Sequence, residues 1–204
     1  FPPDIGGPAT YSALLARELP RYGMEVDVVS FGTVRHLPVG IRHFWYLTKL
    51  VYKSLSCDLI YAQDTVSVGV PAALASVLLH RPLWVRVPGV YAWEQGVQRF
   101  GVTDTLDVFV KKNGYTFPVR MLRTFERLVL RKADLVIVPS HYMQKMVGEG
   151  SVPLHKIQVI YSSVKEPKMS ATKEALREKL RLSGKVILTA GRLVPWKGME
   201  GLLR

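Results

Sequence analysis

Asp134-Leu135-Val136-Ile137-Val138-Pro139-Ser140-His141 is the stretch that decides the fold. Its four consecutive apolar residues, three of them β-branched, are typical of a strand that is buried on both faces of a sheet. Pro139 ends the apolar run, and Ser140 is a residue type that commonly caps the N-terminus of a helix. The stretch therefore predicts a buried strand that leads directly into a helix.

The same alternation of short apolar runs and longer helical patterns continues on both sides of this stretch. Further strands are expected at residues 25–31, 58–62, 83–87, 156–161 and 185–189. Helices are expected at residues 9–22, 42–56, 67–79, 117–132, 141–149 and 173–182. Residues 95–116 are weakly patterned and are expected to form a mobile excursion. This spacing predicts an α/β fold, with a parallel sheet and helices on both of its faces.

The amino-acid composition limits the classes of binding partner and the type of cellular compartment that suit this chain. The 204 residues carry a formal net charge of +12, which favours anionic partners: nucleotides, phosphosugars, acidic lipids or nucleic acid. A merely basic, soluble protein remains the plain alternative. Cys57 is the only cysteine, which excludes an intramolecular disulfide and a cysteine-based zinc cluster and fits a reducing compartment.

The ends of the chain give a further expectation. The sequence contains no run of about 18 apolar residues that would span a membrane, and its start does not have the pattern of a signal peptide. It begins with a Gly/Pro loop at residues 1–8 and stops where a helix is expected to begin. We therefore expect a fragment of a longer protein.

The last fifteen residues, 190–204, form a second informative stretch. They follow the expected strand at 185–189 and place Arg192 and Lys197 in a loop that is framed by Gly191 and Gly198. Backbone N–H groups and two fixed cations at the start of a helix favour an anion. A solvated surface loop with two ordinary cations is the alternative.

Three motifs in this order resemble glycosyltransferase family 4: Gly6-Gly7-Pro8, then residues 134–140, then Gly191-Arg192-Leu193 with Lys197-Gly198. The resemblance implies the GT-B fold, in which two Rossmann-like domains face each other across a cleft. Residues 1–164 would be the N-terminal, acceptor-side domain without its first strand. Residues 165–204 would begin a truncated C-terminal domain that binds the nucleotide sugar.

The resemblance also implies roles for the donor-binding residues. Arg192 and Lys197 would bind the donor diphosphate and stabilise its negative charge as it leaves, without a metal. Gly6, Gly7 and Gly191 would let the backbone approach the donor closely. An ordinary Gly-Pro turn is the alternative for Gly6 and Gly7.

The chain departs from the family pattern at three places. Pro88 stands where many members have a histidine, and Asp64, Trp93 and Glu94 are then the acceptor-side candidates. The two carboxylates have an equally ordinary interpretation as helix caps or surface groups. Tyr161-Ser162-Ser163-Val164 replaces the usual Pro-Asn-Gly-Val hinge. The family's pair of glutamates, spaced eight apart, would lie beyond Arg204.

The expected helix 117–132 combines a basic stripe with an apolar one. Arg120, Arg123, Arg127 and Arg131 share one side, and Met121, Leu122, Phe125, Leu128 and Val129 are expected to pack on the sheet. Lys111 and Lys112 lie nearby, and Arg42, Trp45, Tyr46, Lys49 and Lys53 form a second basic and aromatic group. Two interpretations remain: a solvated helix face, or docking to anionic lipids or to a phosphorylated lipid acceptor.

We therefore expect a retaining glycosyltransferase that moves a hexose from a UDP-, GDP- or similar nucleotide-diphosphate sugar to a glycan or lipid-linked acceptor, as in polysaccharide or glycolipid biosynthesis. No cofactor, metal or nucleic acid is expected. The 204-residue chain alone is expected to be inactive, and its location to be cytoplasmic and peripheral on the inner face of the membrane. The alternative function is a non-catalytic GT-B-like domain that binds an anionic ligand, membrane or partner.

Overall fold

The computed structural model describes residues 7–150, 152–163, 171–191 and 193–203. The chain forms two compact units, Phe1–Ser162 and Ser163–Arg204, which are described separately below. The predicted domain boundary between residues 164 and 165 lies outside the described residues, so the division into acceptor-side and donor-side domains stays a prediction.

A parallel sheet forms the centre of the first unit. Its strands are β1 (Ile60–Ala62), β2 (Leu83–Arg86), β3 (Leu135–Val138) and β4 (Ile157–Val159), and their order in the sheet follows their order in the chain. All three neighbouring pairs are parallel. The predicted α/β fold with a parallel sheet is therefore confirmed.

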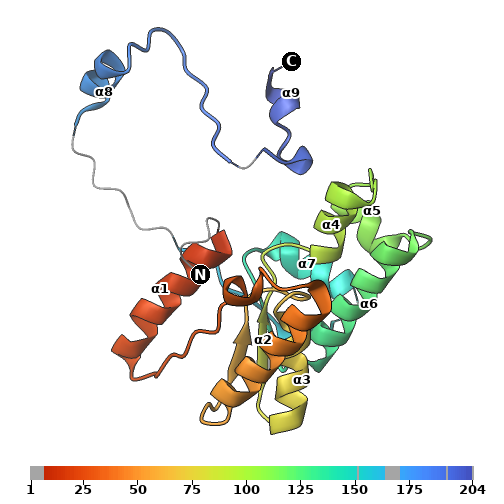
Figure 1. Ribbon diagram of the computed structural model, residues 1–204. Helices are drawn as coiled ribbons and strands as arrows, with labels where there is room; N and C mark the ends of the chain where they lie inside the picture. The colour runs from red at the N-terminus through yellow and green to blue at the C-terminus, as the bar shows by residue number, and fades with distance from the viewer. Residues whose placement is uncertain (1–6, 151, 164–170, 192, 204) are drawn as a thin grey trace. The chain divides into compact units, whose positions relative to one another are not determined.

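One face of the sheet is covered by the helices that connect the strands. When strands occur in sequential order, right-handed crossovers place every connecting helix on the same face. Figure 1 shows α2 and α3 side by side next to the sheet, with α6 beyond α3, and α3 packs against both neighbours. The buried core beneath them includes Ala62, Ala75, Val85, Val119 and Val136.

The bounds of the helices in this unit are as follows: α1 (Gly7–Glu18), η1 (Leu19–Tyr22), η2 (Phe31–Val34), α2 (Val39–Ser54), α3 (Gly69–Leu79), α4 (Tyr91–Arg99), α5 (Leu106–Lys111), α6 (Phe117–Lys132), α7 (His141–Glu149) and η3 (Leu154–Lys156). The predicted cap at α7 is confirmed, because the Ser140 hydroxyl accepts the Met143 N–H at 3.2 Å. Helix α1 meets the opposite face of the sheet, where the ring of Tyr11 lies over the Arg86 guanidinium. Helices therefore lie on both faces, as predicted.

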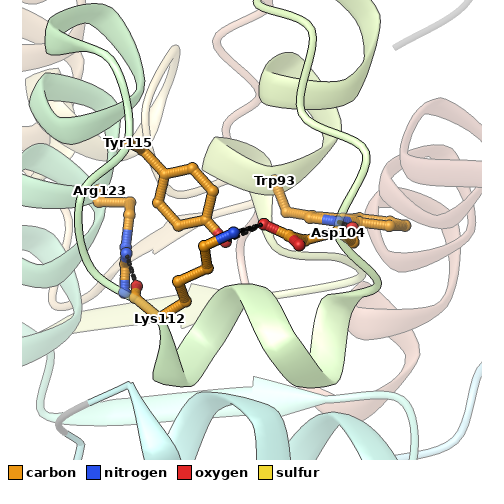
Figure 2. Close-up of polar contacts among 5 residues, drawn as sticks. All are labelled: Trp93, Asp104, Lys112, Tyr115 and Arg123. Atoms are coloured by element: carbon orange, nitrogen blue, oxygen red, sulfur yellow. Dashed lines mark hydrogen bonds and ion pairs between the residues drawn. The ribbon is translucent and has the colours of Figure 1, made fainter.

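Residues 95–116 are not the mobile excursion that the sequence suggested. They contain most of α4 and all of α5, and polar contacts tie them together (Figure 2). The Trp93 indole N–H donates to the Asp104 carbonyl oxygen at 2.9 Å, and the Asp104 carboxylate accepts from Lys112 at 2.8 Å and from the Tyr115 hydroxyl at 2.9 Å. Arg123 of α6 then donates to the carbonyl oxygens of Lys112, at 2.7 Å, and Val110, at 3.3 Å. These contacts join residues 8 to 13 positions apart through polar groups, so hydrophobic periodicity does not reveal them.

Helix α6 is rotated relative to the prediction. Val119, Glu126, Val129 and Leu130 are its buried residues, whereas Phe117, Met121, Phe125 and Leu128 are exposed. The prediction that Met121, Phe125 and Leu128 pack on the sheet is wrong, and the one for Val129 is confirmed. Arg123 and Arg127 are half-buried rather than part of an exposed stripe. Buried hydrogen bonds of Glu126, and bonds from Arg123 to carbonyl oxygens of residues 110 and 112, favour this orientation.

Glu126 is a buried carboxylate that joins three parts of the unit. Its Oε1 accepts the Thr65 hydroxyl at 2.7 Å and the Tyr91 N–H at 3.0 Å, and its Oε2 accepts the Ala92 N–H at 3.3 Å. It therefore caps the first N–H groups of α4, where Val90 has no side chain able to do so. Burial raises the pKa of Glu126, the three hydrogen bonds act against that rise, and the nearby negative charge of Glu94 adds to it.

The expected strand at residues 25–31 does not form. The chain at residues 24–30 is irregular and runs beside α2, where Lys53 pairs with Asp27 at 3.2 Å and the Tyr46 hydroxyl donates to the Val29 carbonyl oxygen at 3.1 Å. A strand requires a neighbour for its backbone groups, and no described strand pairs with this segment.

The second unit contains α8 (Lys173–Lys179), η4 (Pro195–Lys197) and α9 (Met199–Leu203). Thr172 caps α8 by accepting the Ala175 N–H at 3.3 Å. The strand expected at residues 185–189 is absent, and Ile187 and Leu188 are 83% and 87% exposed. The prediction is wrong because the described residues of this unit supply neither a pairing strand nor an apolar surface to cover these side chains.

Replacement of Arg123 by alanine should lower the free energy of unfolding by about 2 kcal/mol, because a charged donor to two carbonyl oxygens is lost. It should also speed proteolysis within residues 104–116. Urea unfolding and limited trypsinolysis measure the two effects. Arg120→Ala, on the exposed side of the same helix, is the matched control, and equal losses in both variants would contradict the role assigned to Arg123.

Replacement of Glu126 by alanine should lower the free energy of unfolding by about 3 kcal/mol, because two N–H groups and a hydroxyl lose their acceptor. Glu149→Ala, which removes an exposed partner of Lys111, should cost less than about 1 kcal/mol. The pKa of Glu126 is raised in the folded state, so its contribution is full below the unfolded pKa of about 4.3 and declines as pH rises through the folded pKa. The wild-type advantage over Glu126→Ala should therefore shrink from about pH 4 upward, and a constant difference would contradict this assignment.

Candidate functional site

The carboxyl ends of the four strands lie at one edge of the sheet. Ligands of parallel α/β proteins bind in the crevice outside these ends. Here the edge is formed by the segments that follow each strand: residues 63–68, 87–90, 139–140 and 160–162. Functional side chains of the first unit are therefore expected on these segments. They are also expected on α1, which meets the sheet beside these segments.

Arg86 is the most unusual side chain at this edge. It ends β2 and is only 3% exposed, and strand alternation directs it away from the core face that Val85 occupies. Its guanidinium carbon lies 3.8 Å from the centroid of the Tyr11 ring, and its Nη2 donates to the Ser162 hydroxyl at 2.8 Å. No described carboxylate forms an ion pair with Arg86, and its buried Nε has no described hydrogen-bond partner.

Other buried polar groups lie on the same face of the sheet. Tyr61 of β1 is paired in register with Trp84, and Gln63 follows Tyr61 by two residues, so both alternate to the face of Arg86. The Tyr61 hydroxyl and the Gln63 Oε1 are buried, and neither makes a hydrogen bond of good geometry with a described residue. Burial raises the pKa of Tyr61, the neighbouring Tyr11 hydroxyl adds to this rise, and the charge of Arg86 and the Gln63 side chain act against it.

We call Tyr11, Tyr61, Gln63, Arg86 and Ser162 the Arg86 cluster. A buried cation normally has a carboxylate partner, because an uncompensated charge in a desolvated site is costly. The π-face of Tyr11 and one hydroxyl give Arg86 only partial compensation. The cluster can therefore offer an anion one cation and several neutral hydrogen-bonding groups at the edge where ligands bind.

The structure places the three acceptor-side candidates in distinct surroundings. Asp64 is half-buried two residues after β1, where its Oδ1 accepts the N–H groups of Val66 at 2.9 Å and Val68 at 3.0 Å. Burial raises the pKa of Asp64, and these backbone donors act against the rise. This carboxylate thus organises the turn before α3.

Trp93 and Glu94 lie in the first turn of α4. The half-buried Trp93 holds the loop at Asp104, as described above. The Glu94 carboxylate lies against Gly89, where a Cβ would be only 2.2 Å from its Oε1, so a side chain at position 89 would displace it. The Glu94 carboxylate therefore lies beside the segment that follows β2.

Two interactions bring the segments after β1 and β2 together. Thr65 and Tyr91 both bind Glu126, and the Ser67 and Tyr91 hydroxyls are 3.1 Å apart. Asp64 and Glu94 consequently belong to neighbouring segments of one edge. Pro88, which stands where a histidine was expected, is exposed in the bend after β2.

The predicted donor-binding residues are only partly described. Gly6 and Arg192 lie outside the described residues. Gly7 is the first residue of α1, with open space around its Cα, and it lies one turn before Tyr11. Gly191 and Lys197 are exposed in the second unit, and Lys197 ends the 3-10 turn before α9. Whether these residues act together stays a prediction.

Sequence reasoning missed Arg86 and Glu126. Arg86 interrupts the apolar run from Leu83 to Val87, and a charge in a buried strand is a signal that could have identified it. Glu126 gave no such signal, because an acidic residue in an amphipathic helix is usually solvated. Its role depends on Thr65 and α4, which are distant in the sequence.

Among the described residues, no helix is both long and apolar enough to cross a membrane. The same residues include no group of three or more His, Cys, Asp or Glu side chains arranged to hold a metal ion.

Comparisons with known proteins agree with this architecture. An uncharacterized glycosyltransferase of Methanocaldococcus jannaschii is 29% identical over 83 residues, which are 40% of this chain and 21% of that protein. Crystal structures of Anabaena HepE with UDP, with UDP-glucose and with UDP and glucose match with TM-scores of 0.57, 0.59 and 0.60 at 20% identity.

The HepE matches cover 94–95% of this chain and 45–46% of HepE, so the chain spans less than half the length of these relatives. At this identity the likeness shows a shared GT-B fold. Residues 6–162 match the family of the glycosyl transferase 4-like domain, which is most of the chain. The chain therefore belongs to the glycosyl transferase 4-like family.

Proposed function

We propose that this chain is part of a retaining glycosyltransferase that transfers a hexose from a nucleotide-diphosphate sugar to a glycan or lipid-linked acceptor, in the biosynthesis of a polysaccharide or glycolipid. The family match over residues 6–162 carries this proposal. In this proposal, residues 1–164 form the acceptor-side domain and residues 165–204 begin the donor-side domain. The protein acts in the cytoplasm, at the inner face of the membrane.

A nucleotide sugar is the donor that the relatives support. HepE has been crystallised with UDP and with UDP-glucose. The net charge of +12 suits a donor with a diphosphate group. We propose a UDP-sugar as the first donor to test, with GDP-sugars as the second, and no metal or other cofactor.

The donor-binding roles follow the family motifs. Arg192 and Lys197 stabilise the charge that develops on the leaving diphosphate, and Gly6, Gly7 and Gly191 allow the backbone to approach it. The diphosphate helps to deprotonate the acceptor on the same face from which it leaves, so the reaction needs few protein bases. The proline at position 88 is compatible with such a mechanism.

Glu94 is the preferred acceptor-side residue of the three candidates. Asp64 accepts two backbone N–H groups that shape its own turn, and the Trp93 indole N–H is used by the Asp104 carbonyl. Glu94 lies in the first turn of α4 against Gly89 of the segment that follows β2, at the edge where ligands of parallel α/β proteins bind. We assign Glu94 to the acceptor hydroxyls, and we assign supporting positions to Asp64 and Trp93.

Arg86 contributes positive charge at the same edge. It lies beneath Tyr11, one turn into α1, and the N-terminus of that helix carries partial positive charge. A buried cation with no ion-pair partner among the described residues and a helix N-terminus together favour a phosphate group. We propose that the Arg86 cluster binds an anionic group of donor or acceptor.

A non-catalytic GT-B-like domain is the second candidate function. The basic and apolar surface of the first unit favours it, because that surface suits an anionic membrane or partner whether or not sugar transfer occurs. The two candidates differ in their dependence on Arg192 and Lys197.

In the full-length protein, Lys197→Ala and Arg192→Ala should each lower kcat for sugar transfer by about 10²–10³-fold, because each removes a preplaced cation from the leaving diphosphate. Release of labelled sugar from UDP- and GDP-sugars provides the assay. Lys179→Ala, a substitution at an exposed residue of the same unit, should leave kcat unchanged. The 204-residue chain alone gives the baseline and should not transfer sugar. Undiminished transfer by both variants would show that the donor assignment is wrong.

Arg86→Met should leave the melting temperature unchanged or raise it, because it removes a buried cation that has no ion-pair partner in the part of the chain that the structure describes. It should raise the KM for donor or acceptor at least about tenfold, because a charged hydrogen bond to the ligand is lost. Calorimetry and steady-state kinetics measure the two effects, and Arg17→Met on exposed α1 is the control. A destabilised variant with unchanged KM would make Arg86 a structural residue.

A further inference from the structure

The helices that cover the core face of the sheet expose an unusual number of large apolar side chains. Phe44 and Trp45 of α2 are 66% and 58% exposed, and Phe117 and Leu128 of α6 are 74% and 56% exposed. We call the full set the outer helix face: Ile41, Phe44, Trp45, Tyr52 and Leu55 from α2 and its end, Leu74, Val77 and Leu78 from α3, and Phe117, Met121, Phe125 and Leu128 from α6.

These side chains belong to one side of the molecule. Within each helix they recur at steps of three or four residues, or of seven as between Trp45 and Tyr52, so each set forms a stripe on a single helix side. The opposite sides of the same helices pack toward the sheet through Tyr46, Ala75 and Val119. Because α3 packs against both α2 and α6, the three outer stripes are neighbours that face away from the sheet.

The charges on these helices have one sign. Helix α2 carries Arg42, Lys49 and Lys53, helix α6 carries Arg120, Arg123, Arg127, Arg131 and Lys132, and α3 carries no charged residue. The only acidic residue of the three helices is Glu126, which is buried. Lys53 is paired with Asp27, but the exposed Lys49, Arg120, Arg131 and Lys132 have no described ion-pair partner.

This combination selects among the surfaces that could cover an apolar face. An exposed apolar patch of this extent marks an interaction site. A second copy of the chain, related by a two-fold axis, would bring basic residues against basic residues. An anionic bilayer instead supplies hydrocarbon for Phe44, Phe117 and Leu128 and phosphates for the lysines and arginines. Trp45 and Tyr52 are the residue types that settle at the headgroup level.

We propose that the outer helix face binds the surface of a membrane that contains anionic lipids. The apolar stripes of α2, α3 and α6 enter the boundary between headgroups and acyl chains, and the surrounding basic residues contact lipid phosphates. This surface is separate from the Arg86 cluster, which lies on the other face of the sheet. The inference is thus independent of whether the protein transfers sugar.

Co-sedimentation of the purified chain with vesicles tests the proposal. The chain should sediment with vesicles of phosphatidylcholine and phosphatidylglycerol at low salt, and much less with phosphatidylcholine alone or at high salt, where the charges are screened. The double variant Phe44→Ser/Trp45→Ser should lower the partition coefficient at least about tenfold. Trp45→Phe should keep the binding but lose the part of the fluorescence blue shift that Trp45 contributes.

Matched variants away from this surface provide the controls. Tyr22→Ser/Met24→Ser removes two exposed apolar side chains next to α1, and it should bind within about twofold of the wild type. Arg120→Glu should weaken binding more than Arg17→Glu, although both change the net charge equally. All of these positions are exposed, and a circular-dichroism melt verifies that each variant is folded.

Three results would overturn the proposal. The first is no sedimentation with anionic vesicles at low salt. The second is equal binding by the Phe44→Ser/Trp45→Ser variant and its Tyr22→Ser/Met24→Ser control. The third is a wild-type dimer, seen by light scattering, that becomes monomeric in Phe44→Ser/Trp45→Ser while vesicle binding does not change, since that result would assign the face to a second copy of the chain.

Discussion

The buried carboxylate of Glu126 is the interaction on which the candidate site depends. One side chain from α6 satisfies the Thr65 hydroxyl after β1 and the first N–H groups of α4 after β2. Without it, two segments of the carboxyl edge and the start of a helix would each require another acceptor. The same bonds rotate α6, and this rotation places Phe117, Met121 and Leu128 on the outside. The single buried carboxylate of Glu126 thus influences both the carboxyl edge of the sheet and the outer helix face.

Strand order explains why the two faces of the sheet differ so much. Sequential parallel strands place α3, α6 and α7 on one face, and the core beneath them is apolar. The other face receives α1 and retains Tyr61, Trp84 and Arg86, which are too polar or too bulky for a tightly packed core. Strand alternation therefore gives neighbouring residues different surroundings: Val85 fills the core, and Arg86 next to it lies on the opposite face at the carboxyl edge of the sheet.

The sequence predicts those parts of the fold that arise locally. The strand at 134–138, the Ser140 cap and the alternation into a parallel sheet depend on neighbouring residues and are confirmed. Strands at 25–31 and 185–189 require a partner that local pattern does not supply, and neither forms. The segment 95–116 is ordered by contacts from Trp93 and Arg123 that periodicity does not encode. On α6, the predicted apolar set is divided, because Val129 is buried whereas Met121, Phe125 and Leu128 are exposed. Hydrogen bonds, and not hydrophobicity alone, determine which side of this helix faces inward.

The candidate site shows the same limit. Asp64 and Glu94 were found because they follow strands, and the structure places both at the edge where strand topology locates ligands. Their chemistry differs because of their surroundings: backbone donors surround the Asp64 carboxylate, whereas Glu94 lies against the bare backbone of Gly89. Arg86 has the rarer environment, since it is buried and no carboxylate of the described residues forms an ion pair with it. A buried cation without such a partner reduces stability, which is why we propose that its charge serves a ligand. A bilayer against α2, α3 and α6 would lie parallel to the sheet, so the carboxyl edge would open along the membrane surface, which suits the lipid-linked acceptor that we propose.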